Sequence, residues 1–210
     1  MIAQTLFWLP ILLVSVVLHE VSHGWVALWF GDTTARDAGR LTLNPLRHID
    51  PFGSVVLPLL LAVSGAPFLF ACAKPVPVNP FRLSRPKRDM IFVGAAGVTM
   101  NFILAFAAAV ILGGLRPVSP VWVHGLSIFI VFNIVLGVFN LFPIPPLDGS
   151  RVLAGLLPVR PAAALLRLER YGMWILFGLI FLGFFRAVML PIVELFLSVL
   201  VRLTGAELAF

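Results

Sequence analysis

The sequence predicts an all-α polytopic membrane protein with five to six transmembrane helices. Of its 210 residues, 60% are hydrophobic and only 11% are charged, whereas a soluble domain carries roughly 25% charged residues. Several apolar runs also reach the length of about 20 residues that a helix needs to cross a bilayer. This composition excludes an ordinary soluble domain. The net charge of +6 fits loops held against an anionic leaflet better than a nucleic-acid partner.

Five apolar segments are the expected spans. They cover residues 2–30, 90–115, 121–142, 168–185 and 187–203. No Lys or Arg precedes the first run, whereas a cleavable signal peptide normally begins with a basic region. We therefore expect the first segment to be retained as a membrane helix. Arg186 separates the last two spans and marks the turn between them.

Residues 52–73 are apolar but are interrupted by Pro58, Gly65 and Pro67, so that each uninterrupted piece is too short to span. The flanking loops, 31–50 and 74–89, each carry several Lys or Arg residues. Such residues concentrate on the cytoplasmic side of a membrane. A re-entrant segment keeps both loops on that side, and we favour it over the alternative of a sixth span.

Two short segments beside the first span have β-like patterns. Residues 33–44 place β-forming residues on either side of a turn at 37–39 and predict a small β-hairpin. Residues 73–80 alternate Pro with Val, which predicts an edge strand or an extended loop. With no internal repeat, the chain is expected to form one membrane domain over 1–210, with a core over 1–157 and a C-terminal helical pair over 165–203.

The motif His-Glu-x-x-His lies inside the first apolar run. His19 and His23 are four residues apart, so a helix places both imidazoles on one face, where they can bind one metal ion. Glu20 lies about 100° further round, within reach of a water bound to that metal. Zinc lowers the pKa of such a water to about 7, and a carboxylate can act as its general base. Three ionisable groups at membrane depth favour this interpretation over a chance motif or a histidine that only joins two helices.

Catalytic zinc has three protein ligands and one open position, so the motif needs a third ligand. His48 lies in a basic loop and His124 near the outer start of a span, and neither is well placed. Asp148 follows a span and three helix-breaking prolines in "NLFPIPPLDGSRV". Non-helical backbone at membrane depth is tolerated only inside protein or beside a wet cavity. We therefore expect Asp148 to be the third metal ligand. The alternative role for Asp148 is the N-cap of the following helix, which is compatible with metal binding.

These motifs resemble the site-2 protease family of intramembrane zinc metalloproteases, peptidase family M50. "HEVSH" in a membrane helix and the later "NLFPIPPLDG" carry the resemblance, and "GDTTARDAGRLTLNPLRHIDPFGS" and "AKPVPVNPFRL" are similar to its short bacterial branch without PDZ or CBS domains. The resemblance implies that His19, His23 and Asp148 hold one Zn²⁺ per chain and that Glu20 is the general base. It also implies that Asn140 helps to bind substrate, and it places Asn101 in a family G-x-x-x-N element.

The resemblance further implies cleavage in or near transmembrane segments of membrane-protein substrates. We expect a multi-pass protein of the cell membrane, embedded in the lipid bilayer, with its site reached from the cytoplasmic side and with no nucleic-acid partner. An unwound substrate could pair with the expected hairpin or with the Pro-Val segment. A membrane metal transporter using the same His–His–Asp group is the alternative. The sequence defines neither the physiological substrate nor the oligomeric state.

Overall fold

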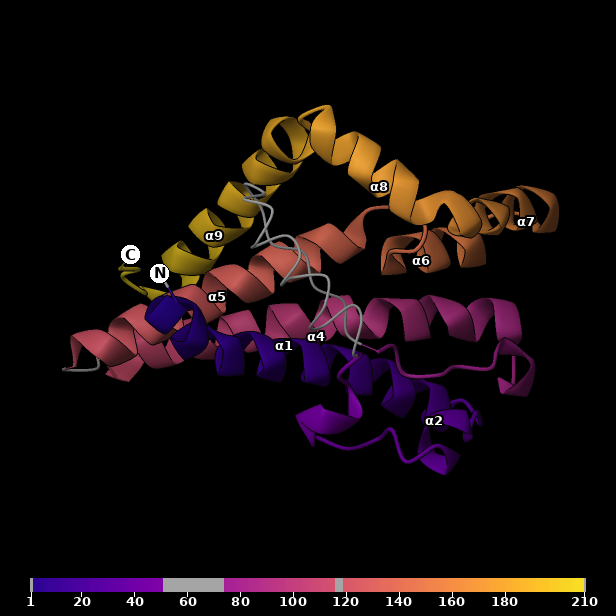
Figure 1. Cartoon of the computed structure of the whole chain (residues 1–210), viewed down its shortest axis with the longest axis horizontal. Coiled ribbons are helices and arrows are strands. Elements are labelled where there is room, and N and C mark those ends of the chain that lie inside the picture. Colours follow the sequence, from indigo (N-terminus) through magenta and orange to yellow (C-terminus); the bar gives the residue numbers. More distant parts are fainter. Residues whose placement is uncertain (1, 51–73, 116–118, 210) are drawn as a thin grey trace.

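Three long helices form the centre of the molecule. The computed structural model describes residues 2–50, 74–115 and 119–209. Helices α1 (Ile2–Trp29), α4 (Pro86–Leu115) and α5 (Pro120–Leu141) lie side by side (Figure 1). Helix α4 is in the middle, because it packs against α1, α5, α6 (Asp148–Leu156) and α9 (Leu190–Thr204). Figure 1 also shows the two ends of the chain close together at one end of the bundle.

Small residues on α4 allow its neighbours to approach closely. The face that α4 turns toward α5 and α9 is rich in alanine, and small residues let helix backbones pack tightly in membrane proteins. Branched side chains of α5 and α9 fill the space opposite. The buried cluster consists of Ala105, Ala108, Ala109, Leu112, Ile130, Ile134, Val138, Met189, Val193, Leu200 and Ala206.

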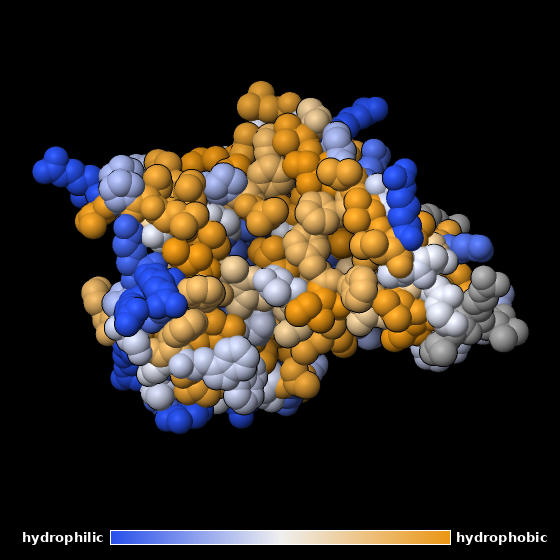
Figure 2. Space-filling model, turned by 180° about the vertical axis from the view of Figure 1, so that it is seen from behind, coloured by the Kyte–Doolittle hydropathy of each residue, from blue (hydrophilic) through white to orange (hydrophobic). Residues whose placement is uncertain are grey.

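In the part of the chain that the structure describes, three helical stretches are long and apolar enough to cross a membrane. They cover Pro86–Gly114, Pro120–Leu141 and Arg186–Thr204, and they confirm three of the expected spans. Helix α1 has 28 residues, of which Leu13–Trp29 form a shorter apolar stretch. Figure 2 shows apolar side chains over much of one face, with hydrophilic side chains toward its rim. The segment expected to re-enter, 52–73, lies outside the described residues.

The expected span at 168–185 is shorter than predicted. After α7 (Val159–Arg167), the chain forms a 3-10 turn at Leu168–Tyr171 and then α8 (Gly172–Phe181). Ten α-helical residues rise only about 15 Å. Gly183 ends the segment, because its φ of 77° belongs to the left-handed region that favours glycine. A π-helical turn, Phe185–Met189, then leads into α9, so that α8 and α9 form a V (Figure 1).

The expected hairpin at 33–44 is wrong, because residues Thr34–Asp37 form a short helix, α2. The Asp32 carboxylate overrides the β-forming threonines, since its Oδ1 accepts a hydrogen bond from the Thr34 N–H at 3.0 Å. Gly39, with a φ of 63°, then turns the chain back before any strand can form. The Thr33 hydroxyl donates to Asp37 and, together with Arg36, lowers the pKa of that exposed carboxyl.

Residues 74–79, here called the strap, form neither helix nor strand and run as an elongated, uncoiled trace (Figure 1). The strap has no regular strand partner among the described residues. At its start, the Lys74 N–H donates to the His48 carbonyl at 2.9 Å, and the buried Arg40 guanidinium donates to the Lys74 carbonyl at 2.7 Å. At its end, the Asn79 N–H donates to Asp32 Oδ2 at 2.6 Å. These bonds fix the two ends of the strap, and a bond from the Val76 N–H to Glu20 fixes its middle beside α1.

Candidate metal centre

One face of α1 carries a polar stripe through an otherwise apolar helix. Ser15, His19 and His23 recur at intervals of four residues, so they lie in one row, and all three are buried. A matching row on α4 faces them and is formed by Val93, Gly97 and the residue one turn later, Asn101. The site is therefore built between two rows with the same helical period.

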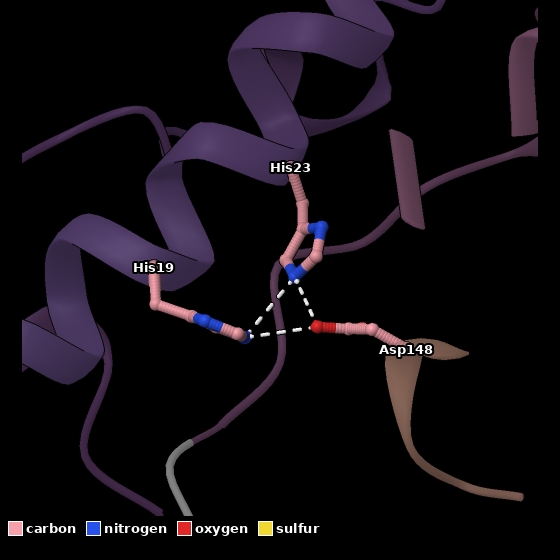
Figure 3. A group of neighbouring side chains, drawn as sticks. All are labelled: His19, His23 and Asp148. Atoms are coloured by element: carbon pink, nitrogen blue, oxygen red, sulfur yellow. Dashed lines mark hydrogen bonds and ion pairs between the residues drawn. The ribbon is translucent and has the colours of Figure 1, made fainter. Parts of the chain in front are cut away.

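His19, His23 and Asp148 converge from two different helices (Figure 3). The distance from Asp148 Oδ2 is 3.1 Å to His19 Nε2 and 3.2 Å to His23 Nε2. The two Nε2 atoms lie 3.2 Å from each other. All three side chains are buried, and they form a group able to hold a metal ion. The structure thus brings together the three residues that the sequence predicts as ligands.

Asp148 reaches the histidines because of the turn before α6. The chain leaves α5, passes through the prolines at 143–146 and begins α6 at Asp148 itself. Gly149 makes this tight return possible, because a Cβ there would lie 2.6 Å from the Phe142 carbonyl oxygen. The alternative of an N-cap is wrong, since Leu147 occupies that position and Asp148 turns its carboxylate to the two imidazoles.

The far nitrogen of each imidazole has an oxygen partner. His23 Nδ1 lies 2.6 Å from the carbonyl oxygen of Val93, which can only accept a hydrogen bond, so Nδ1 carries the hydrogen. His19 Nδ1 lies 2.6 Å from Asn101 Oδ1. In a neutral imidazole that donates from Nδ1, the Nε2 atom keeps its lone pair. Both Nε2 lone pairs are therefore available inside the triangle.

This arrangement fits zinc. Asp148 Oδ2 is buried and, despite its short separations from the histidines, has no hydrogen-bond partner in the described part of the chain. Three acceptor atoms facing one another without a donor repel each other, and a cation bound between them would stabilise the arrangement. A tetrahedral site with bonds of about 2.0 Å has ligand atoms about 3.3 Å apart, close to the observed separations of 3.1–3.2 Å. Two imidazoles and a carboxylate form a donor set that suits zinc.

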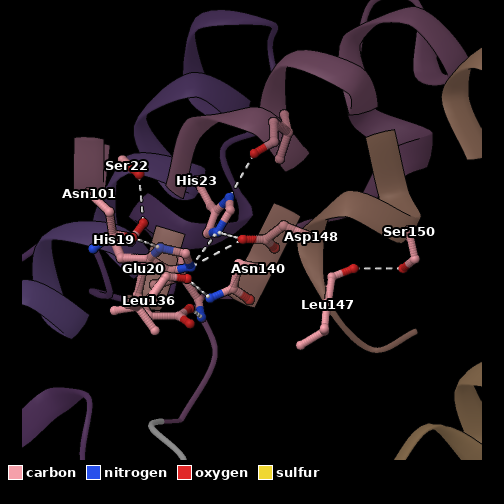
Figure 4. Close-up of polar contacts among 12 residues, drawn as sticks. His19, Glu20, Ser22, His23, Asn101, Leu136, Asn140, Leu147, Asp148 and Ser150 are labelled. Carbon is pink, nitrogen blue, oxygen red and sulfur yellow. Dashed lines mark hydrogen bonds and ion pairs between the residues drawn. The ribbon is translucent and has the colours of Figure 1, made fainter. Parts of the chain in front are cut away.

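Glu20 lies next to the triangle and is held from outside it. Its carboxylate oxygen Oε2 accepts a hydrogen bond of 2.9 Å from the Val76 N–H of the strap. The side chain is partly exposed, unlike the three candidate ligands. Glu20 is therefore placed beside the candidate metal position without being one of the converging groups (Figure 4).

The other predicted residues take different places. Asn140 occupies the last turn of α5, near the site in Figure 4, and its amide donates to the Leu136 carbonyl of its own helix at 3.0 Å. His48 is buried in the loop, where Nε2 bonds the Thr42 carbonyl at 2.8 Å. His124 lies near the C-terminal tail, 3.2 Å from the Ala209 carbonyl. Neither of these histidines belongs to the metal group.

Three residues of the centre have roles that the motifs alone do not reveal. Gly97 lets the histidines approach α4, because a Cβ there would lie 2.5 Å from His23 Nε2 and collide with His19. Asn133 and Ser15 lie behind Asn101 in a buried hydrogen-bonded chain. The signal for Ser15 was its position one turn before His19, and the signal for Asn133 was an amide within an apolar span.

Comparison with known proteins identifies the family. The model of peptidase family M50 matches residues 116–183. YwhC of Bacillus subtilis (strain 168), named as a candidate zinc metalloprotease, is 41% identical over 170 residues, which cover 77% of this chain and 74% of YwhC.

Rip2 of Mycobacterium tuberculosis is also named as a candidate zinc metalloprotease. It is 34% identical over 67% of this chain, and the match covers 53% of Rip2, about half of its length. The Methanocaldococcus jannaschii zinc metalloprotease MJ0392 is 24% identical over 73% of this chain and 36% of its own length. No solved structure matches the chain. The chain belongs to peptidase family M50, the site-2 protease family of zinc metalloproteases.

Proposed function

We propose that this chain is an intramembrane protease that hydrolyses peptide bonds in or near transmembrane segments of membrane-protein substrates. The observation that carries the proposal is the buried triangle of two Nε2 atoms and one carboxylate oxygen, 3.1–3.2 Å apart. The triangle lies on helices packed within a bundle that has at least three span-length apolar stretches. A metal site in such surroundings is suited to substrates that are themselves in the membrane.

His19, His23 and Asp148 are the proposed zinc ligands. When bound, zinc supplies Lewis-acid chemistry that polarises a carbonyl and makes water a nucleophile at neutral pH. Glu20 is the proposed general base, which accepts a proton from the attacking water and returns it to the leaving amine. The hydrogen bond from the Val76 N–H orients the Glu20 carboxylate for both transfers.

The substrate has to present an extended segment, because a helix hides its amides in internal hydrogen bonds. We propose that the strap receives this segment, since it is elongated (Figure 1), lies beside Glu20 and has no regular strand partner among the described residues. Pairing along an exposed backbone edge is a common mode of peptide recognition. Asn140, in the last turn of α5, is proposed to bind the substrate backbone.

We further propose that the protein is a multi-pass protein of the cell membrane with its site reached from the cytoplasmic side. The proposal is supported by the basic residues in the loops at 31–50 and 74–89. Labelling of single cysteines introduced at Leu46 and Phe81, both exposed, in a chain whose own Cys72 is replaced by serine, tests this orientation. Reagents that do not cross the membrane should label both positions only when the cytoplasmic side is open.

The function is tested with the purified protein in lipid nanodiscs and a model transmembrane substrate, with product detected by mass spectrometry. Glu20→Gln should retain zinc and lose cleavage, because it removes the base and keeps the ligands. Asp148→Asn should lose much of both. Glu169→Gln is the matched control, since Glu169 is exposed on the turn before α8, and it should cleave like the parent.

The same variants separate the protease from the alternative, a metal transporter. A transporter would move zinc into sealed vesicles, would tolerate Gln at position 20 and would leave the substrate intact. Cleavage that continues unchanged in Glu20→Gln, or zinc flux without any cleavage, would contradict the proposed activity.

A further inference from the structure

A buried chain of side chains runs through three helices and ends at His19. Ser15 Oγ on α1 accepts a hydrogen bond of 2.9 Å from Asn133 Nδ2 on α5. Asn101 Nδ2 on α4 donates to Asn133 Oδ1, also at 2.9 Å, and Asn101 Oδ1 lies 2.6 Å from His19 Nδ1. Ser15, Asn101 and Asn133 are completely buried. Polar groups so deep in a membrane bundle require a reason beyond packing.

The direction of this chain is set by one backbone carbonyl. Asn133 Nδ2 also donates to the Phe129 carbonyl at 2.9 Å. A carbonyl oxygen can only accept, so the atom that faces it must be the NH₂ group of Asn133 and not its oxygen. The Asn133 oxygen therefore points toward Asn101.

The same reasoning fixes the orientation of the Asn101 amide. Because the Asn133 oxygen can only accept, Asn101 must present its NH₂ group there and its own oxygen to His19. That oxygen fixes the hydrogen of His19 on Nδ1 and leaves the lone pair on Nε2, the atom that faces Asp148. Reversing either amide would place two donors or two acceptors against each other in a site where water cannot compensate.

We propose that Asn133 is a positioning residue that acts through Asn101 to fix the tautomer of His19 and thereby the metal affinity of the site. The inference rests on the proposed function only in taking His19 as a metal ligand. Asn133 contacts neither the candidate ligands nor Glu20 in any described interaction. Its effect is therefore exerted through the orientation of the Asn101 amide.

Zinc affinity is the first readout, measured by competition with a chelator on the full-length protein in detergent or nanodiscs. Asn133→Leu leaves the Asn101 amide free to reverse, and we expect the zinc dissociation constant to rise about tenfold, the lower end of the range for partners of metal ligands. Asn133→Ser is the second variant, in case leucine prevents folding, and should act in the same direction.

Two buried serines provide a matched comparison. Ser15→Ala removes one of the two acceptors of the Asn133 NH₂ group but leaves the other, the Phe129 carbonyl. We therefore expect the zinc dissociation constant to change by about threefold at most. Ser127→Ala removes an equally buried hydroxyl of α5 that bonds the Val123 carbonyl and the Ala209 N–H. It should leave zinc affinity unchanged.

A double-mutant cycle separates the proposed route from a general loss of stability. If Asn133 acts through Asn101, the double variant of Asn101→Leu and Asn133→Leu should bind zinc no more weakly than Asn101→Leu alone. Additive losses would overturn the proposal, because they would show that Asn133 affects the site independently.

The tautomer itself is observed by nitrogen NMR of the metal-free protein with labelled histidine, with the His19 signals assigned from a His19→Gln variant. The parent should show an unprotonated Nε2 in His19, and Asn133→Leu should show a mixture of tautomers. An unchanged His19 spectrum together with unchanged zinc affinity would overturn the inference. If His23→Ala binds zinc as tightly as the parent, the proposed metal site is wrong instead, which is a distinguishable result.

Discussion

Replacing Gly97 by alanine tests how closely α4 must approach the two histidines. A Cβ at this position would lie 2.5 Å from His23 Nε2 and 2.7 Å from His19 Nδ1. Non-bonded heavy atoms normally rest about 3.5–4.0 Å apart, so the imidazoles would have to withdraw by about 1 Å. Metal sites tolerate deviations of only about 0.2 Å in their ligand distances.

The required movement also conflicts with the hydrogen bonds that orient the imidazoles. Nδ1 of His19 is held at 2.6 Å by Asn101, and Nδ1 of His23 is held at 2.6 Å by the Val93 carbonyl. Loss of such an outer partner alone weakens metal binding about 10–100-fold. Because the ligands themselves move, we expect Gly97→Ala to weaken zinc binding at least about 100-fold, or about 2.7 kcal/mol.

Zinc binding is measured by chelator competition and by metal analysis after dialysis. Gly114→Ala is the control, because Gly114 lies on the same helix and a Cβ there meets nothing within 4 Å. Alanine favours a helix over glycine by about 1 kcal/mol, so both variants should keep the helix. If folded Gly97→Ala binds zinc as tightly as Gly114→Ala, the geometry described for the centre is wrong.

Three further substitutions address the surroundings of the site. Gly149→Ala places a Cβ 2.6 Å from the Phe142 carbonyl oxygen and should displace the start of α6, which carries Asp148. Zinc affinity, measured by chelator competition, should fall about tenfold. An affinity equal to that of the parent would contradict this prediction. Val76→Pro removes the N–H that donates to Glu20. Cleavage should slow about tenfold, the equivalent of one hydrogen bond to a charged group, while the zinc content stays unchanged. Loss of zinc would show that the strap supports the metal ligands instead. Asp89→Ala removes the carboxylate that accepts a hydrogen bond from the Arg85 N–H at the start of α4. The free energy of unfolding, measured in denaturant, should fall by about 1 kcal/mol. An unchanged value would show that this hydrogen bond contributes nothing to stability.

The first two candidate ligands were predictable because they are close together in the sequence, whereas the third is distant. The spacing of His19 and His23 fixes their common face once the segment is a helix. In the structure, their Nε2 atoms lie 3.2 Å apart, as a shared metal ion requires. Asp148 is more than 120 residues away in the chain, and only the need for a third ligand and the family motif pointed to it. The structure brings it to 3.1 Å from His19.

The errors arose where a tertiary contact or one side chain overrides local propensity. Residues 33–44 contain β-forming residues, but the Asp32 carboxylate accepts a hydrogen bond from the Thr34 N–H, and Thr34–Asp37 form a short helix. The apolar run at 168–185 has the length of a span, but its helix ends at Phe181, before Gly183. The direction of the amides of Asn101 and Asn133 could not be predicted, because it depends on a backbone carbonyl of another turn, that of Phe129.

X-ray absorption spectroscopy of the zinc-loaded protein examines the metal environment directly. We predict a zinc ion surrounded only by nitrogen and oxygen at about 2.0–2.2 Å, with the scattering pattern of two imidazoles. His23→Ala should remove one imidazole from that pattern. A sulfur neighbour at about 2.3 Å, or a pattern that His23→Ala leaves unchanged, would contradict the assignment of His19, His23 and Asp148 as the metal centre.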